Sequence, residues 1–268
     1  EIIMATLHAR FGSRLGPVTI PIGVAEDFRG VIDIIRMKAR YFDKDGTSER
    51  IEDIPPEYLD AAQTAGHWDI DFEGWGLAAL SVPGHKGLMG PGGIGALLLS
   101  QDFARGLSPI LTGGTGSASD SEVQPEYMPD KFESGTANLP GIYGLKAAVD
   151  FILETGVERL REHETALTKR FLDGIRDVPG VRLAGPWELE NRAGVISLDF
   201  RNIDNAEASF LLEERWGIMT RCGLHCAPNA HKTLGTFPQG TVRFSPGWFT
   251  TEAEIDAAVG AVRELAAK

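Results

Sequence analysis

The sequence has little cysteine: its 268 residues include two, Cys222 and Cys226. At most one disulfide can form within the chain, so a secreted scaffold held together by several disulfides is excluded. The sequence also has no apolar run of about 18 residues, so no membrane-spanning helix is expected. The first residues, "EIIMATLHARFGSRLG", lack the apolar core and the cleavage site of a signal peptide. These absences predict a cytoplasmic protein.

Basic residues are also scarce relative to acidic ones. There are 26 Lys and Arg against 38 Asp and Glu, which gives a formal net charge of −12. This charge disfavours nucleic acid or an anionic membrane as the main partner. A local anion site needs only a few backbone N–H groups and one or two cations, and it is compatible with this charge. The length suffices for one large domain or two modest ones.

Residues 1–59 contain short apolar stretches. Alternating apolar residues at 18–22 predict a half-buried strand, and residues 30–42 mix valine, isoleucine and aromatics in the same way. Asp45–Gly46 marks a turn. Residues 54–65, "IPPEYLDAAQTA", predict the start of a helix, with proline tolerated in its first turn.

Two regions of different texture follow. Residues 60–145 are rich in glycine with short apolar runs, which is typical of α/β strands that end in ligand-binding loops. Residues 146–174 give the clearest helical signal. Its apolar residues recur on roughly one face. They are Leu153, Val157, Leu160, Leu167 and Phe171.

The last part of the chain is rich in strand signals. They fall at 181–185, 194–200, 217–223 and 241–249. A final helix is predicted with Thr250 or Thr251 as N-cap, and Glu254 completing a capping box. Together with the long helix, this pattern predicts a small α+β domain over residues 146–268.

Lys86 carries the first chemical signal, within "SVPGHKGLMGPGGIGALLL" at residues 81–99. It lies between two apolar runs and precedes a glycine-rich loop. Low-dielectric surroundings disfavour the ammonium form of lysine, and the neutral amine condenses with an aldehyde. On the local residues alone, a surface lysine in a loop is an equal alternative.

Two further segments carry weaker signals. Asp60 and Gln63 could place a carboxylate and an amide on one ligand, and a buried carboxylate can stabilise a protonated ring nitrogen. A solvated helix face explains that segment equally simply. Arg243, in "TVRFS", could bind a carboxylate through two hydrogen bonds, although an edge-strand arginine is the simpler alternative.

The loop "RCGLHCAPNAH", residues 221–231, holds both cysteines. Cys226 follows His225, whose imidazolium would favour the thiolate, whereas Cys222 ends a predicted strand, where burial would keep it protonated. Metal binding by these three residues and His231 is disfavoured, because the spacing fits no common zinc pattern. A pair of inert thiols is the remaining alternative.

Taken together, these motifs are far more specific than any one. Asp60-x-x-Gln63, "GHKG", "GGTGSASDSE", "ESGTANLPGIYGL", "RCGLHCAP" and "VRFS" follow in an order that resembles class V aminotransferase-fold enzymes. These enzymes use pyridoxal 5′-phosphate, and the similarity is greatest to the cysteine desulfurase-related branch. The resemblance covers residues 60–268.

The resemblance implies a role for five residues at the cofactor. Lys86 would form the Schiff base, and Asp60 would pair with the pyridinium nitrogen. Gln63 would hydrogen-bond the phenolic oxygen, and His85 would contact the phosphate. Thr115 would reach the phosphate of the partner subunit's cofactor in a homodimer. No metal is implied.

The resemblance also implies the reaction. Arg243 would bind the α-carboxylate of the substrate, and Cys226 matches the sulfur-accepting cysteine. Cysteine would give alanine and an enzyme persulfide, which a sulfur acceptor protein could discharge. A selenocysteine lyase, another class V aminotransferase, or a catalytically incomplete fusion fragment without cofactor are the alternatives. Pro83 departs from the family pattern, because a phosphate-binding hydroxyl is common at its position.

Residues 1–59 resemble a different family. "GPVTIPIGVAEDFRGVIDIIRMKARYFDKDG" followed by "IPPEYLDAA" is similar to part of the GTPase domain of elongation factor G. The phosphate loop and the guanine-specificity motif are missing, so no GTP binding is expected. The expected fold is therefore α/β. It combines a GTPase-like fragment (1–59) with a partial fold type I pyridoxal-phosphate transferase, which comprises a large-domain remnant (60–145) and a small α+β domain (146–268).

Overall fold

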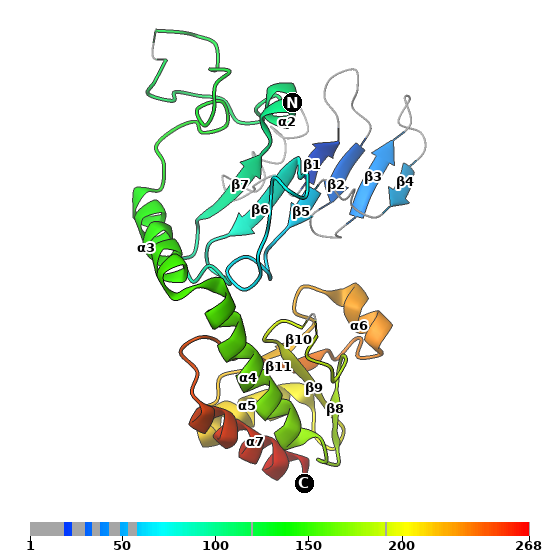
Figure 1. Ribbon diagram of the computed structural model, residues 1–268. Helices are drawn as coiled ribbons and strands as arrows, with labels where there is room; N and C mark the ends of the chain where they lie inside the picture. Colours follow the sequence, from blue (N-terminus) through cyan, green and yellow to red (C-terminus); the bar gives the residue numbers. More distant parts are fainter. Residues whose placement is uncertain are drawn as a thin grey trace. The chain divides into compact units, whose positions relative to one another are not determined.

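The computed structural model describes residues 19–22, 30–33, 38–42, 49–52, 58–118, 120–190 and 192–267, with side chains from residue 61 onward (Figure 1). The chain divides into two compact units. One comprises Glu1–Ala65 with Ile70–Val149, and the other Gly66–Asp69 with Asp150–Lys268. Within the described residues, no helix is long and apolar enough to cross a membrane.

The first four strands form an antiparallel sheet in sequential order. They are β1 (Thr19–Ile22), β2 (Gly30–Asp33), β3 (Lys38–Phe42) and β4 (Glu49–Glu52). The strand predicted at 18–22 is confirmed, and the stretch 30–42, with its similar mixture of residues, contains two strands. The turn predicted at Asp45–Gly46 lies outside the described residues.

A second sheet, in the order β5-β6-β7, positions the lysine motif. Its strands are β5 (Tyr58–Asp60), β6 (Ala79–Pro83) and β7 (Gly95–Leu99). β5 runs parallel to β6, and β7 runs antiparallel to it. The face of β6 that holds Leu80 and Val82 is buried, whereas Leu97 and Leu98 of β7 are 52% and 40% exposed. Helices α2 (Gln101–Gly106) and α3 (Leu139–Thr155) follow.

The helix predicted to start within 54–65 is wrong. Tyr58–Asp60 is a strand, and turns follow it. The reason is pairing with β6: Leu59 lies opposite Leu80, and the Ala61 N–H donates to the Ser81 carbonyl at 2.9 Å. Sheet pairing has overridden the helix propensity of an alanine-rich segment.

The single long helix predicted at 146–174 is two helices. α3 ends at Thr155, and α4 (Val157–Ile175) begins after Gly156, whose φ of 89° is left-handed. Such a φ interrupts the helical path and favours glycine. Leu160, Leu167 and Phe171 are buried as expected, whereas Leu153, on the preceding helix, is 74% exposed.

The second unit is built on a four-stranded antiparallel sheet in the order β10-β11-β9-β8. The strands are β8 (Val181–Leu183), β9 (Ile196–Phe200), β10 (Arg221–Gly223) and β11 (Thr241–Phe244). All four lie where the sequence predicts strands. The helices α5 (Asn205–Trp216), α6 (Pro228–Leu234) and α7 (Glu252–Ala266) connect or follow them.

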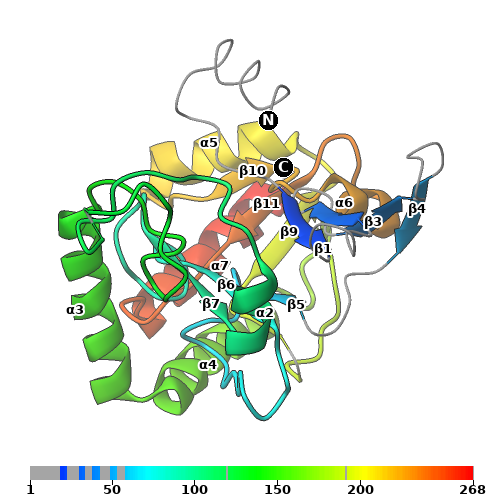
Figure 2. The ribbon, with the colours of Figure 1, turned by 90° about the horizontal axis from the view of Figure 1, so that it is seen from above.

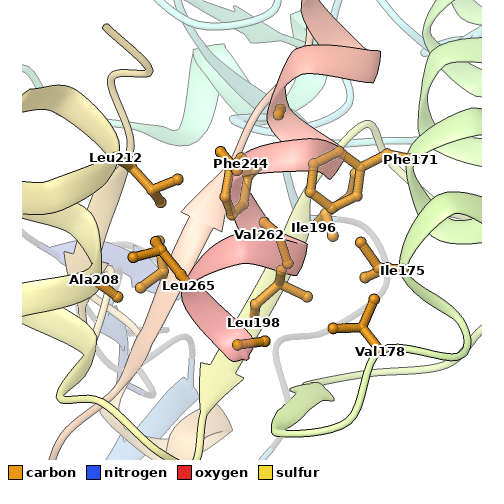
Figure 3. Packing of buried hydrophobic residues seen from close by; sticks show 14 of the residues in the cluster. Phe171, Ile175, Val178, Ile196, Leu198, Ala208, Leu212, Phe244, Val262 and Leu265 are labelled. Carbon is orange, nitrogen blue, oxygen red and sulfur yellow. The ribbon is translucent and has the colours of Figure 1, made fainter. Parts of the chain in front are cut away.

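The core of this unit lies between the sheet and three helices. α7 contacts both α4 and α5 and lies between them in the view of Figure 2. Figure 3 shows how α4, α5, α7 and the strands contribute to one cluster, which includes Phe171, Ile196, Leu198, Leu212, Phe244 and Val262. α7 begins at the predicted capping box, in which the Thr251 hydroxyl accepts from the Glu254 N–H and the Glu254 carboxylate accepts from the Thr251 N–H.

Candidate functional site

The Lys86 motif forms a tight turn at the end of β6. The Gly90 N–H donates to the Gly84 carbonyl at 2.7 Å, and the Met89 N–H donates to the Lys86 carbonyl at 2.8 Å. A Cβ at Gly84 would lie 2.9 Å from the carbonyl oxygen of Ile94. A Cβ at Gly90 would lie 2.9 Å from the carbonyl oxygen of Gly84. The glycines therefore let the backbone close tightly around the lysine.

Lys86 itself is exposed, and so is His85. The low-dielectric surroundings expected around Lys86 are absent from the described part of the chain. Of the two flanking apolar runs, the one in β6 is largely buried, but most of β7 is exposed. The Lys86 amine is therefore accessible to a ligand.

The parallel pairing of β5 and β6 brings the first two predicted site segments, Asp60-x-x-Gln63 and the Lys86 motif, to one edge of the sheet. Asp60 ends β5 and lies opposite Ser81, and Lys86 follows the end of β6. The carboxyl ends of parallel strands are where ligands bind in α/β proteins. Gln63 lies exposed in the turn after β5. The side chain of Asp60 lies outside the described residues.

Thr115 lies in a loop held by hydroxyl groups. The Ser117 hydroxyl donates to Asp130 at 2.6 Å and accepts from the Tyr127 hydroxyl at 2.9 Å. The Thr115 hydroxyl lies 3.0 Å from the Ser117 hydroxyl. Because the single hydroxyl hydrogen of Ser117 is donated to Asp130, Thr115 is the donor in the Thr115–Ser117 hydrogen bond. Thr115 is half-buried, and its contact with a partner's phosphate stays a prediction.

In the second unit, the pairing of β10 with β11 places two arginines opposite each other. Arg221 is the register partner of Arg243, and Cys222 is the partner of Val242. Paired residues of antiparallel strands project from the same face of the sheet. Val242 is fully buried in the helix-covered core, so Arg221 and Arg243 lie on the opposite face.

The loop after β10 brings Cys226 back to Arg221. Arg221 Nη2 donates a hydrogen bond to Cys226 Sγ, and the nitrogen and the sulfur are 3.8 Å apart. His225 Nε2 lies 2.9 Å from the Arg221 carbonyl oxygen. His225 and Cys226 both have left-handed φ angles, 51° and 62°. Left-handed non-glycine residues are uncommon, and they cluster at functional sites.

The expectation that an imidazolium stabilises the Cys226 thiolate is wrong. The pKa of His225 is lowered from 6.5 to about 4, first by burial and then by the positive charges of Arg243, His231 and Arg221. The His225 ring is therefore neutral at pH 7. The charged group in contact with the sulfur is the guanidinium of Arg221, a residue that the sequence did not single out.

The arginine expected to bind a carboxylate is available for that purpose. Arg243 is half-buried, and its Nε is buried without a hydrogen-bond partner among the described residues. Burial and the neighbouring Arg221 lower the pKa of Arg243, while Cys226 raises it. The group remains a cation at neutral pH, because an arginine pKa starts far above that range.

The expected burial of Cys222 is also wrong: both cysteines are exposed. Cys222 belongs to a three-residue strand at the edge of the sheet. Within the described residues, no group of three or more His, Cys, Asp or Glu side chains could hold a metal ion.

Residues 57–258 match the aminotransferase class-V family, and the chain belongs to this family. Members of the family use pyridoxal 5′-phosphate. Over the matched part, the fold is part of a fold type I pyridoxal-phosphate transferase. Residues before 57 lie outside the match.

Named relatives point to one branch of the family. A probable cysteine desulfurase of Methanothermobacter thermautotrophicus is 34% identical over 218 residues, which cover 80% of this chain and 54% of that protein. A probable cysteine desulfurase of Pyrococcus abyssi is 34% identical over 210 residues, 77% of this chain and 51% of that protein. The chain thus spans about half the length of the curated relatives it matches.

Solved structures that are similar to this chain belong to the same branch as these relatives. The apo structure of a cysteine desulfurase from Thermococcus onnurineus has a TM-score of 0.72 and 34% identity, covering 78% of this chain and 52% of that one. The Escherichia coli cysteine desulfurase CsdA has a TM-score of 0.69 and 28% identity, covering 77% and 50%.

Proposed function

We propose that this chain carries the lysine and the sulfur-accepting cysteine of a pyridoxal-phosphate-dependent cysteine desulfurase-like enzyme. Such an enzyme removes sulfur from cysteine, which leaves alanine and a persulfide on the protein. The observation that carries the proposal is the exposed thiol of Cys226, 3.8 Å from a guanidinium nitrogen, within the part of the chain that matches the aminotransferase class-V family.

The residues near the end of β6 fit the cofactor. The accessible amine of Lys86 is set in a turn whose glycines leave no room for a Cβ, at the same sheet edge as Asp60. Lys86 would hold the cofactor's aldehyde carbon and move protons, and Asp60 would pair with the ring nitrogen. Gln63 would bind the phenolic oxygen and His85 the phosphate. When bound, the cofactor supplies an electron sink for bond cleavage next to the substrate's amino group.

The substrate would be held and attacked by residues of the second unit. Arg243 would bind the α-carboxylate, for which its unpartnered Nε is a free donor within the described part of the chain. The thiolate of Cys226 would attack the sulfur of the substrate, because thiolate is the nucleophilic form of cysteine.

The assembly is also part of the proposal. Thr115 would contact the phosphate in a partner subunit of a homodimer, and a sulfur acceptor protein would take the persulfide in the cytoplasm. Pro83 offers no hydroxyl, so one phosphate contact common in the family would be lost. Residues 1–59 would be a fragment similar to elongation factor G that binds no guanine nucleotide, with domain boundaries near 59 and 145.

The test uses the full chain with L-cysteine, added pyridoxal phosphate and a thiol reductant. The proposal predicts a violet-edge absorption band that borohydride fixes onto Lys86, as peptide mapping can show. It also predicts equal yields of sulfide and alanine, both lost in Cys226→Ala. A band with no sulfide would favour another class V activity. If no band forms, the chain is an incomplete fragment and the proposal fails.

A further inference from the structure

A sulfur nucleophile needs a cation nearby, because the thiolate and not the thiol attacks. Three basic side chains surround Cys226: His225, Arg221 and Arg243. His225 is adjacent in sequence, but its pKa of about 4 leaves it neutral where a desulfurase would work. Arg243 is coupled electrostatically to Cys226. The hydrogen bond to the sulfur comes from Arg221.

We propose that Arg221 is the residue that orients and stabilises the Cys226 thiolate, and that His225 fixes Arg221 in place through the contact of its Nε2 with the Arg221 carbonyl oxygen, the His225 clamp. This inference rests on the proposed function, because it assigns the charge partner of the proposed nucleophile. The role is distinct from that of Arg243, which is left for the substrate carboxylate.

The contacts around Cys226 form a closed ring. The guanidinium of Arg221 donates to the sulfur of Cys226. The backbone carbonyl oxygen of Arg221 lies within hydrogen-bond distance of the imidazole of His225, the residue before Cys226. A carbonyl only accepts, so His225 Nε2 carries the hydrogen, and the neutral ring has no hydrogen on Nδ1. The ring of contacts explains how two consecutive residues keep left-handed φ angles.

Protonation of His225 is opposed from several sides. Arg221 lies on β10, just before the loop, Arg243 lies on the neighbouring strand β11, and His231 lies on α6. The imidazole centroids of His225 and His231 are 5.6 Å apart. His231 is itself buried, and its Nδ1 is 2.7 Å from the Thr236 hydroxyl. The clamp therefore keeps one hydrogen-bonding pattern through the neutral pH range.

The register of the sheet explains why Arg221 serves the sulfur. Arg221 and Arg243 are opposite each other, and two like charges so placed repel. An anion between them or beside them relieves that repulsion. The Cys226 thiolate is one such anion. In agreement with this, Cys226 raises the pKa of Arg243, whereas Arg221 lowers it.

The test measures the rate of alkylation of Cys226 in the full chain. All variants carry Cys222→Ala, so that Cys226 is the one thiol that can react. Neutral iodoacetamide and anionic iodoacetate are compared at pH 7. Neither reaction needs the cofactor, so the result is independent of whether the desulfurase proposal holds. The variants are Arg221→Gln, the charge-preserving Arg221→Lys, and Arg215→Gln as a matched control on an exposed arginine of α5.

Arg221→Gln should slow iodoacetamide about threefold. The attacking sulfur loses the hydrogen bond and the adjacent positive charge of the guanidinium, and a unit charge at this distance in a water-like dielectric is worth about 1 kcal/mol. Iodoacetate should slow further, because the anionic reagent also loses its attraction. Arg221→Lys should retain most of the iodoacetate preference, and Arg215→Gln should match the parent.

His225→Gln tests the clamp. This substitution leaves the net charge at pH 7 unchanged, but it removes the imidazole that contacts the Arg221 carbonyl oxygen. The preference of Cys226 for iodoacetate should therefore fall toward that of Arg221→Gln. Circular dichroism confirms that each variant folds. An Arg221→Gln protein that is folded and alkylates like the parent with both reagents overturns the proposal, as does equal slowing by Arg215→Gln.

Discussion

Gly240 lies where the chain enters β11, against the backbone of the strand that leads to Cys226. A Cβ added at Gly240 would be 2.1 Å from the carbonyl oxygen of Gly223 and 2.2 Å from its carbonyl carbon. The φ of Gly240 is +77°, in the left-handed region. Both neighbouring atoms belong to the backbone, so no side-chain rotation can relieve the contact. Gly240→Ala is therefore a sharp test of how closely β10 and β11 must approach.

The expected loss of stability has two parts. An alanine held at this φ costs about 1–2 kcal/mol, because its Cβ crowds the following carbonyl. Relief of the 2.1 Å contact needs a shift of about 1 Å between the strands where Gly223 pairs with Thr241, and overpacking of this kind costs about 1–3 kcal/mol. The sum is about 2–5 kcal/mol.

Gly235→Ala is the matched control. Gly235 also has a left-handed φ, +68°, but no atom lies within 4 Å of its added Cβ, so only the first cost applies. Urea unfolding by tryptophan fluorescence suits the comparison, because four of the five tryptophans lie in the second unit. They are Trp68, Trp187, Trp216 and Trp248. Equal losses of unfolding free energy in the two variants would refute the steric argument. Gly240→Ala should also change the iodoacetate preference of Cys226, and Gly235→Ala should leave it unaltered.

Three further predictions concern the second unit and are tested by urea unfolding. Thr251→Ala removes the N-cap of α7 and should cost about 1 kcal/mol, and Thr251→Ser should restore most of it; no change would contradict the capping box. Leu198→Ala leaves a cavity at a fully buried position and should cost about 2–5 kcal/mol, against less than about 0.5 kcal/mol for the exposed Leu153→Ala. The pKa of His225 is about 4 in the folded protein, against an ordinary value of 6.5. As the pH falls, the unfolded chain is therefore protonated at this residue before the folded chain is. Stability is lost between about pH 6.5 and 4. His225→Gln should flatten this part of the stability profile measured at pH 7, 5.5 and 4.5, and an unchanged slope would argue against the neutral ring.

The strands of the second unit were predictable because their signals are local. Ile196, Leu198 and Phe200 alternate with half-buried residues along β9, and this period of two is visible in the sequence. The capping box at Thr251 and Glu254 is equally local, since each residue satisfies the backbone of the other across three positions. Patterns that are complete within a few residues need no knowledge of the rest of the chain.

The two errors in the fold have the opposite cause. The periodic apolar residues continue from α3 into α4, so nothing in the pattern reveals that Gly156 adopts a left-handed φ. The segment 54–65 ends in alanines, which are good helix formers, whereas the strand conformation of Tyr58–Asp60 depends on β6, about 20 residues further along the chain. Tertiary pairing decides such segments, and single-sequence propensities do not contain it.

The electrostatics of the Cys226 loop depend on sheet register in the same way. Adjacency in sequence suggested His225 as the charge partner, but its charge is set by burial and by two arginines that only the β10–β11 pairing brings together. A register slip of one residue would place Arg221 opposite Val242 or Phe244, both of which are buried in the core. The burial of those two side chains therefore fixes the register, and the register fixes which cations surround the thiol. The chemistry of the loop follows from apolar packing on the far side of the sheet.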